Sequence, residues 1–415
     1  MPKSSAAQPS LTRWRNSIFA LFLVNGTTSA AWFSRMPAVR DDLGASLQVM
    51  GLVVLCGAVG SILGLALAPL LLSRVGARRS IAITITLLFV AFTVAAVGAG
   101  MLGLTWLTAL GMLAWGLGVG ATDVVVNIEA AAVETEAGKT LMPLMHAFFS
   151  FGTVIGALLG AVTAALGIGV TVHMLIAIVP SVALTLWALP GVPVRQVLTE
   201  TGSMAAKQPW RTRLQRGWQV WRDPAVLLIG AGVLANGFAE GAAGDWMAIG
   251  AVDGHGHEQA TGALLFGIFV GGMTLMRLVG GPIVDRWGRV TTLRLSALTA
   301  IIGIALYITI DTFWVLAIAS ALWGMGVALG FPLGMSAAAD DPKGPLRVGA
   351  VSIIGYGAFL IGPPLLGLLG GTLGILPALS VLLVLLLIAA LVAPAARERS
   401  GPRAFDAFDD PARAL

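Results

Sequence analysis

The sequence of 415 residues is poor in charge, since only 11% of its side chains are Asp, Glu, Lys or Arg. A soluble domain carries about 25% of these residues. Five long stretches contain none of the four: residues 43–73, 80–122, 140–194, 312–339 and 348–396. A membrane-crossing helix needs roughly 20 apolar residues, so the longest stretches have room for two crossings each. This absence of charge argues against a soluble fold and predicts a protein that crosses a bilayer many times.

Other absences narrow the function. A single cysteine, Cys56, excludes an intrachain disulfide, and no Cys/His cluster has metal-ligand spacing, so we expect no metal and no cofactor. The sequence has neither a nucleophile–base set nor a phosphate-binding Gly-x-x-x-x-Gly-Lys-Ser/Thr loop, which argues against an enzyme and an ATP-driven pump. The net charge of +5 does not indicate nucleic acid, because the basic residues lie in short loops between apolar segments. The expected partners are a small-molecule substrate and the lipid bilayer, and we expect a monomer without an obligate protein partner.

Hydropathy and the Gly, Pro and charge breaks predict an all-α membrane protein, because a backbone in lipid must satisfy its own hydrogen bonds. The twelve expected transmembrane helices are 17–36, 48–72, 80–99, 104–130, 142–167, 171–190, 225–250, 260–284, 291–310, 313–339, 347–370 and 374–394.

The loops predict the orientation of these helices. Basic residues gather before the first helix and in alternate loops, whereas the opposite loops are uncharged or acidic. Positive residues stay in the cytoplasm, so both termini are expected there, in a multi-pass protein of the cell (inner or plasma) membrane. The expected domains are an N-terminal tail (1–16), a first six-helix half (17–190), a central cytoplasmic loop (191–224), a second six-helix half (225–396) and a C-terminal tail (397–415).

The two halves resemble each other at a nearly constant offset of about 210 residues. Four short segments recur in the same order: Leu23–Gly26 with Leu234–Gly237, Arg74–Arg78 with Arg286–Arg289, Trp115–Val119 with Trp323–Val327, and Phe151–Gly152 with Tyr356–Gly357. Repeated six-helix units are typical of secondary transporters, which bind substrate between the halves.

The segment from Gly281 to Arg289 resembles the signature loop of the major facilitator superfamily, Gly-x-x-x-Asp-Arg-x-Gly-Arg. The resemblance implies the major facilitator fold, with two six-helix pseudo-repeats, and a role for this loop in holding one conformation. In the first half Ser73 stands where the family has Asp, which weakens the equivalent loop there. The implied loop residues are Gly281, Asp285, Arg286, Gly288 and Arg289, with Arg74, Gly76 and Arg78 in the first half.

Two segments carry a narrower resemblance. Trp32-x-x-Arg35-x-Pro37, together with Asp123 and Asn127, is similar to the MosC/YbjJ-like group of transporters. The same Asp123/Asn127 pair and the segment from His146 to Gly152 are similar to the fucose:proton symporter branch. These resemblances imply a small polyhydroxylated solute and the proton as coupling ion.

Three titratable residues are candidates for proton coupling, because ionisable groups inside a membrane are costly and ask for a function or a partner. Glu240 lies deep in the predicted helix 225–250, and the alternative is a carboxyl that is hydrogen-bonded and never titrates. Asp123 shares a helix face with Asn127, unless both lie at the membrane surface. His146 is either a proton relay or a structural group. The nearby Arg277 is expected to extend toward the signature loop.

Side chains that donate and accept hydrogen bonds, or that offer a ring face, are candidates for substrate binding. The alternative for each tryptophan is packing or a place at the lipid interface. The candidates are Asn25, Trp32, Asn127, Asn236, Trp246, Trp323 and Tyr356.

The sequence thus predicts a secondary active transporter for a small polar solute such as a sugar, polyol or inositol, working by alternating access with proton symport. Proton-driven efflux of a metabolite or drug-like compound remains open. A non-transporting membrane sensor is a further alternative.

Overall fold

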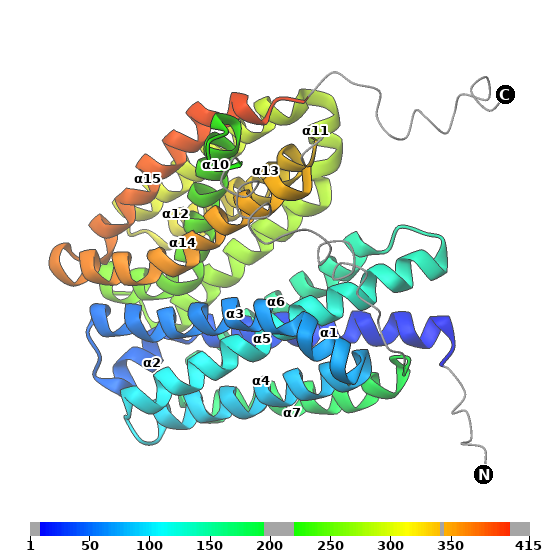
Figure 1. The fold of residues 1–415 in the computed structure, drawn as a ribbon. Coiled ribbons are helices and arrows are strands. Elements are labelled where there is room, and N and C mark those ends of the chain that lie inside the picture. Colours follow the sequence, from blue (N-terminus) through cyan, green and yellow to red (C-terminus); the bar gives the residue numbers. More distant parts are fainter. Residues whose placement is uncertain (1–8, 195–219, 341–343, 399–415) are drawn as a thin grey trace, which may run out of the picture.

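The computed structural model describes residues 9–194, 220–340 and 344–398, which form helices and short connections without a β-strand. The predicted all-α class is confirmed. Figure 1 shows two bundles of helices, one from each half of the chain. The first contains α1 (Leu11–Phe33), α2 (Met36–Leu43), α3 (Leu47–Val75), α4 (Ala77–Gly100), α5 (Thr105–Ala137), α6 (Met142–Ala165) and α7 (Val170–Ala188). The second contains α10 (Pro224–Ala242), α11 (Gln259–Thr309), α12 (Phe313–Val327), α13 (Gly330–Ala339), α14 (Gly344–Leu373) and α15 (Ile375–Val392).

Ten helices in the described part of the chain are long and apolar enough to cross a membrane. One of them, α11, has 51 residues and is interrupted at Gly288, where φ is 75° and ψ is 161°. It therefore contains two of the helices that the sequence predicts. The 23-residue α1 is not among the ten, and it carries polar residues such as Asn25 and Thr28 in its buried face.

The structure differs from the predicted boundaries in four places. A short helix, α2, lies where the sequence predicts a loop. The predicted helix 313–339 is broken into α12 and α13, and α5 continues to Ala137. Beyond α10 the chain winds into two π-helical turns, η2 (Ala243–Met247) and η3 (Gly250–Gly254). The predicted central loop and both tails lie largely in residues 1–8, 195–219 and 399–415, outside the described residues.

The loops of the internal repeat have the same backbone geometry. Gly76 between α3 and α4 has φ 77° and ψ 171°, close to the values of Gly288. Positive φ favours glycine, which has no Cβ. Beside each glycine an arginine donates to carbonyls at the end of its own bundle: Arg78 Nη2 to Pro190 O (2.9 Å) and Arg289 Nη1 to Ala396 O (3.3 Å).

Glycines also set the helix spacing in both halves. A Cβ on Gly116 would lie 2.0 Å from Gly57 O of α3, and a Cβ on Gly324 would lie 2.0 Å from Phe269 O of α11. In the first bundle α1 and α6 interlock in the same way, since a Cβ on Gly26 would lie 2.1 Å from Phe149 O. Small residues of this kind let membrane helices approach backbone to backbone.

Candidate functional site

The two bundles meet along α3 with α14 and along α6 with α11. In Figure 1 they converge at the side where α2 lies and diverge toward the side where α1 begins. On the converging side Arg40 of α2 forms an ion pair with Asp253 of η3, and Gln259 Nε2 donates to Asp41 Oδ2 at 3.0 Å. These contacts join the first half to the second, and we call them the closing contacts.

Carboxyls at and beside the closing contacts have shifted pKa values. The pKa of Asp253 is raised above its ordinary value of 3.8, chiefly because burial disfavours the charged carboxylate, and the Arg40 guanidinium opposes that rise only in part. Burial raises the pKa of Asp42 as well, against the pull of Arg35. Both carboxyls therefore bind a proton more tightly in this conformation than in free solvent.

A cavity of about 650 Å³, the wide cavity, lies between the first turns of α6 and the helices α11 and α13. This volume falls within the roughly 300–1,000 Å³ of typical ligand pockets. Its walls include polar groups from both halves: His146 and Ser150 of α6, with Thr274 and Arg277 of α11. The site therefore offers hydrogen-bond donors, acceptors and a positive charge to a solute.

Arg277 is paired within the second half. Its Nη2 donates to Glu240 Oε1 at 3.0 Å, and its Nε reaches Ala328 O at 3.5 Å. The expectation that Arg277 extends toward the signature loop is wrong, because Glu240 lies close enough on α10 to neutralise it. Glu240 is likewise not an isolated carboxyl. A coupling role for Glu240 stays a prediction, now for one member of an ion pair.

A second cavity of about 340 Å³, the inner cavity, is also lined from both halves. Aromatic rings dominate its walls, and its one carboxyl is that of Asp245 in η2. The lining rings are Phe33, Trp115, Phe149, Tyr356 and Phe359. Phe149 also lines the wide cavity, so its side chain lies at the boundary between the two.

Asp123 and Asn127 are brought together on α5, as the sequence predicts. Asn127 Nδ2 donates to Asp123 Oδ1 at 3.1 Å and to Asp123 O at 2.9 Å. Both side chains are half-buried, and Asp123 lies within electrostatic range of Tyr356 of α14. This pair therefore lies beside the interface of the two halves, and protonation of Asp123 stays a prediction.

The candidate tryptophans lie in the packed core. Trp32, Trp246 and Trp323 are fully buried, and none of them lines the wide or inner cavity. Trp323 Nε1 donates to Ala239 O at 3.0 Å, and its ring meets Tyr307 edge-on. Their role as substrate contacts stays a prediction that requires the solute to displace packed neighbours.

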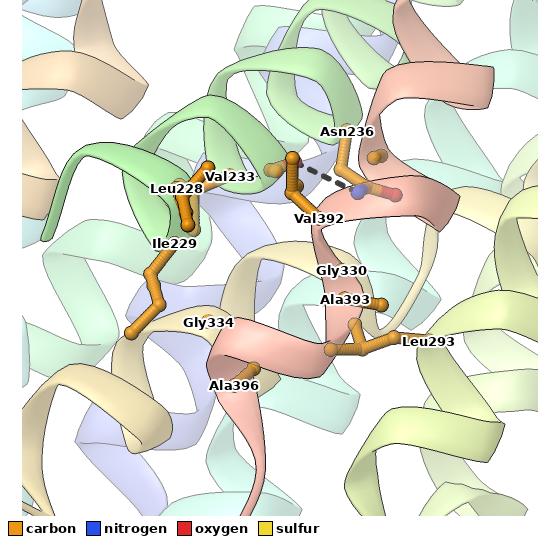
Figure 2. Close-up of a pocket in the computed structure, with 12 residues that line it drawn as sticks. Leu228, Ile229, Val233, Asn236, Leu293, Gly330, Gly334, Val392, Ala393 and Ala396 are labelled. Atoms are coloured by element: carbon orange, nitrogen blue, oxygen red, sulfur yellow. Dashed lines mark hydrogen bonds between the residues drawn. The ribbon is translucent and has the colours of Figure 1, made fainter. Parts of the chain in front are cut away.

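Asn236 lies within the second bundle and away from both larger cavities. Figure 2 shows it at a small cavity of about 20 Å³ between α10, α13 and the end of α15, with its Nδ2 donating to Gly232 O at 2.9 Å. Asn25 is the counterpart in the first bundle and is equally buried. The Oδ1 atom of each asparagine has no hydrogen-bond partner in the described chain. Sequence reasoning placed both asparagines toward substrate, and the structure places them against neighbouring helices.

Arg289 carries the contacts of the signature loop. This buried side chain donates to Asp340 Oδ2 at 2.8 Å and to Ser336 Oγ at 3.2 Å, which joins α11 to α13. Asp285 and Arg286 are exposed, and Asp285 forms no ion pair with any described residue. In the first half Arg74 is exposed, while Arg78 binds carbonyls after α7. The expected holding role thus rests on Arg289 and Asp340 in this conformation.

Sequence reasoning missed the importance of Asp245 and Phe149. The sequence does contain a signal for Asp245, because it is a carboxyl in an otherwise uncharged stretch, residues 241–252. Its orientation toward a cavity depends on the π-helical turns, which no residue pattern marks.

The chain is similar along most of its length to known transporters. The model of the Major Facilitator Superfamily matches residues 17–341 and 246–411. Uncharacterized transporter y4wD of Sinorhizobium fredii (strain NBRC 101917 / NGR234) is 31% identical over 362 residues, which cover 86% of this chain and 91% of that protein. Membrane protein MosC of Rhizobium meliloti is 26% identical over 372 residues, covering 89% of this chain and 86% of that protein.

Solved structures share the fold. The nucleoside transporter NupG aligns with a TM-score of 0.69 and 16% identity, over 92% of this chain and 98% of that one. The D-xylose-proton symporter aligns with a TM-score of 0.68 and 14% identity, over 92% and 97%. The matched family model and the 31% identical relative together show that this multi-pass membrane protein belongs to the major facilitator superfamily, a family of transporters and not of enzymes.

Proposed function

We propose that the protein is a secondary active transporter that moves a small polar solute by alternating access, coupled to proton symport. The observation that carries the proposal is a pair of cavities that are lined from both halves. On one side of these cavities the halves are joined by the closing contacts, Arg40 with Asp253 and Gln259 with Asp41. A solute site between two bundles that is sealed on one side is what alternating access requires.

The proposed topology has twelve crossings and cytoplasmic termini. Counting the two parts of α11 separately and adding α1 to the ten candidate spans brings the number to twelve. The basic residues of the loops support a cytoplasmic position for both termini. The wide cavity then faces the cytoplasm, and the closing contacts face the outside.

Polar groups on the wide cavity support a hydroxyl-rich solute. His146, Ser150 and Thr274 can exchange hydrogen bonds with hydroxyls, which suits sugars, polyols and nucleosides. Two structural relatives support the same class by name, as a nucleoside transporter and a D-xylose-proton symporter. The name of the latter also supports the proton as coupling ion.

The test begins with binding. Purified protein is screened by thermal unfolding with monosaccharides, inositols and nucleosides, because a ligand of the native state raises its stability by RT ln(1 + [L]/Kd). Solutes that bind are then assayed for uptake into proteoliposomes with and without an imposed pH gradient. We expect accumulation that depends on the gradient. Binding without any transport would overturn the proposal.

A matched pair of variants locates the solute. Ser150→Ala removes a buried hydroxyl from the wide cavity and is expected to weaken binding several-fold. Ser320→Ala removes an equally buried hydroxyl of α12 that lines neither cavity, and it is expected to leave binding unchanged. Equal effects of the two variants would place the solute elsewhere.

Export of an amphipathic compound is the second candidate function. The aromatic lining of the inner cavity favours it, since rings bury apolar surface well. Stabilisation by amphipathic compounds alone in the thermal screen, with uptake into inverted vesicles, would support export over the leading proposal.

A further inference from the structure

Asp245 is a buried carboxyl without a partner. Its side chain lies on the wall of the inner cavity, and the residue is only 8% exposed. Within residues 9–194, 220–340 and 344–398 it forms no hydrogen bond from its carboxyl and no ion pair. A buried carboxylate is strongly unfavourable unless a positive charge or hydrogen bonds compensate it.

The charged groups on the elements around Asp245 already have other partners. The π turn η2 packs against α10, α11, α1 and η3. Glu240 of α10 and Arg277 of α11 pair with each other, and Asp253 of η3 pairs with Arg40. Arg35, just beyond α1, donates to Thr163 Oγ1 and Ile168 O. Tyr356 of α14 is the other titratable group on the cavity wall. The described chain therefore supplies no cation to Asp245.

The walls around Asp245 have the composition of a site for an organic cation. Phe33 of α1, Trp115 of α5, and Tyr356 and Phe359 of α14 line the same cavity. Aromatic rings attract a cation, most strongly where water is excluded. A proton on Asp245 would satisfy the carboxyl but would not interact with the ring faces on the cavity wall.

We propose that the inner cavity binds a small organic cation, a protonated amine or quaternary ammonium group on a compact apolar body, with Asp245 as its counter-charge. The cavity of about 340 Å³ has room for such a group. The inference rests on the proposed transport function and adds a charge to the solute. It places the ammonium group of the solute at Asp245 and its apolar body against the rings of the inner cavity.

The π-helical geometry supports a ligand site at this position. Single π turns inside helices are frequent at functional sites. Their backbone hydrogen bonds reach one residue further than those of an α-helix, which changes the direction of the side chains. Here two such turns, Ala243–Met247 and Gly250–Gly254, follow α10 directly. Asp245 lies in the first of them.

The experiment measures binding to the full-length protein in detergent, without any transport. The probes are cyclohexylamine, its uncharged analogue cyclohexanol, and tetraethylammonium, whose charge does not depend on pH. We expect both cations to raise the melting temperature and cyclohexanol to have little effect. Asp245→Asn is expected to lower the affinity for both cations at least tenfold, whereas Asp245→Glu, which keeps the charge, retains part of it.

Controls separate a lost site from a lost fold. Asp311→Asn removes an exposed carboxyl that lines neither cavity, and it is expected to leave cation binding intact. The melting temperature of each variant without ligand reports its folding. Equal binding of cyclohexanol and cyclohexylamine, or unchanged cation binding in a folded Asp245→Asn protein, would overturn the inference. If Asp245 binds only a proton, neither cyclohexylamine nor tetraethylammonium will raise the melting temperature, and this result too would overturn the inference. If cation binding fails in these tests, gradient-driven uptake of an uncharged polyol would still support the proposed transport function.

Discussion

Phe149 separates the two cavities at the scale of a single side chain. The residue lines both, and its backbone carbonyl lies close against Gly26 of α1. The backbone of this residue is therefore held in place while the side chain lies between two open volumes. We expect the rotamer of this side chain to control passage between the cavities.

Replacement of this ring should open the path. In a Cys56→Ala background, Phe33→Cys places a thiol on the inner cavity. We expect Phe149→Ala to speed its alkylation by a water-soluble maleimide roughly tenfold, which corresponds to a barrier lower by about 1.4 kcal/mol. Phe151→Ala is the control, because Phe151 is 50% exposed on the outer surface of the same helix. Equal rates in the two variants would show that Phe149 does not obstruct the path.

The sequence predicts residue chemistry better than residue partners. The Asp123–Asn127 contact follows from i, i+4 spacing on one helix and was predictable. The Glu240–Arg277 pair joins two helices whose relative rotation is set by packing, so no local pattern announces it. The same limit applies to Asn236, because the sequence shows on which side of its helix the residue lies but not which neighbouring helix that side contacts.

Among the elements, the α1–α6 contact depends on the absence of a side chain. A Cβ at Gly26 would lie 2.1 Å from Phe149 O and 3.0 Å from Thr153 N, both backbone atoms that cannot move aside. Gly152 and Gly156 of α6 meet α1 in the same manner. These helices can pack at this distance only with glycine at those positions.

Gly26→Ala should therefore lower the free energy of unfolding by about 1–3 kcal/mol, the usual cost of overpacking. Gly271→Ala is the matched control, because nothing lies within 4 Å of a Cβ built there. We expect that change to be neutral or stabilising by up to about 1 kcal/mol, since alanine favours a helix over glycine. Unfolding in detergent with a chemical denaturant measures both. Equal stabilities would mean that α1 and α6 separate without cost.

Hydropathy predicts most helices because a bilayer imposes both length and composition on each crossing. It does not predict α2, which is too short and too polar to be a crossing. Hydropathy predicts α12 and α13 as one helix, because the break between them at residues 328–329 contains neither a charged residue nor a proline. The π turns after α10 are invisible for the same reason, because their hydrogen bonds shift by one residue without a change in composition.

At the scale of the whole molecule, the closing contacts make the conformational equilibrium depend on pH. Burial raises the pKa of Asp253 above 3.8 in this conformation. Separation of the halves on that side would return the Asp253 carboxyl to water and to its ordinary pKa. The closed form therefore binds more protons than the opened form, and its relative stability falls as pH rises from 3.8 through the raised pKa.

Spin-label distances test this dependence. Leu102 and Trp314 are 53% and 73% exposed and lie in different halves, and in a Cys56→Ala background both accept a label as cysteine. Residue 102 follows α4, and residue 314 lies in the first turn of α12. We expect the population of long distances to grow as pH is raised. Asp253→Asn should flatten much of that response, and a distance distribution that ignores pH would contradict the assignment.

The unequal use of glycine at the α1–α6 and α10–α14 contacts has a mechanical consequence. In the first bundle α1 and α6 are interlocked, whereas in the second a Cβ on Gly237 would meet its nearest atom at 3.6 Å and one on Gly357 would meet nothing within 4 Å. The α1–α6 contact is thus locked backbone to backbone, whereas the α10–α14 contact at these two glycines is looser, and α10 runs directly into the π turns. Rewinding one π turn into α-helix would rotate the residues that follow it by about 100° around the axis. A change of winding at the end of α10 would therefore turn the side chains that follow it without breaking a close backbone contact at Gly237 or Gly357, whereas the same movement in α1 would break its contact with α6.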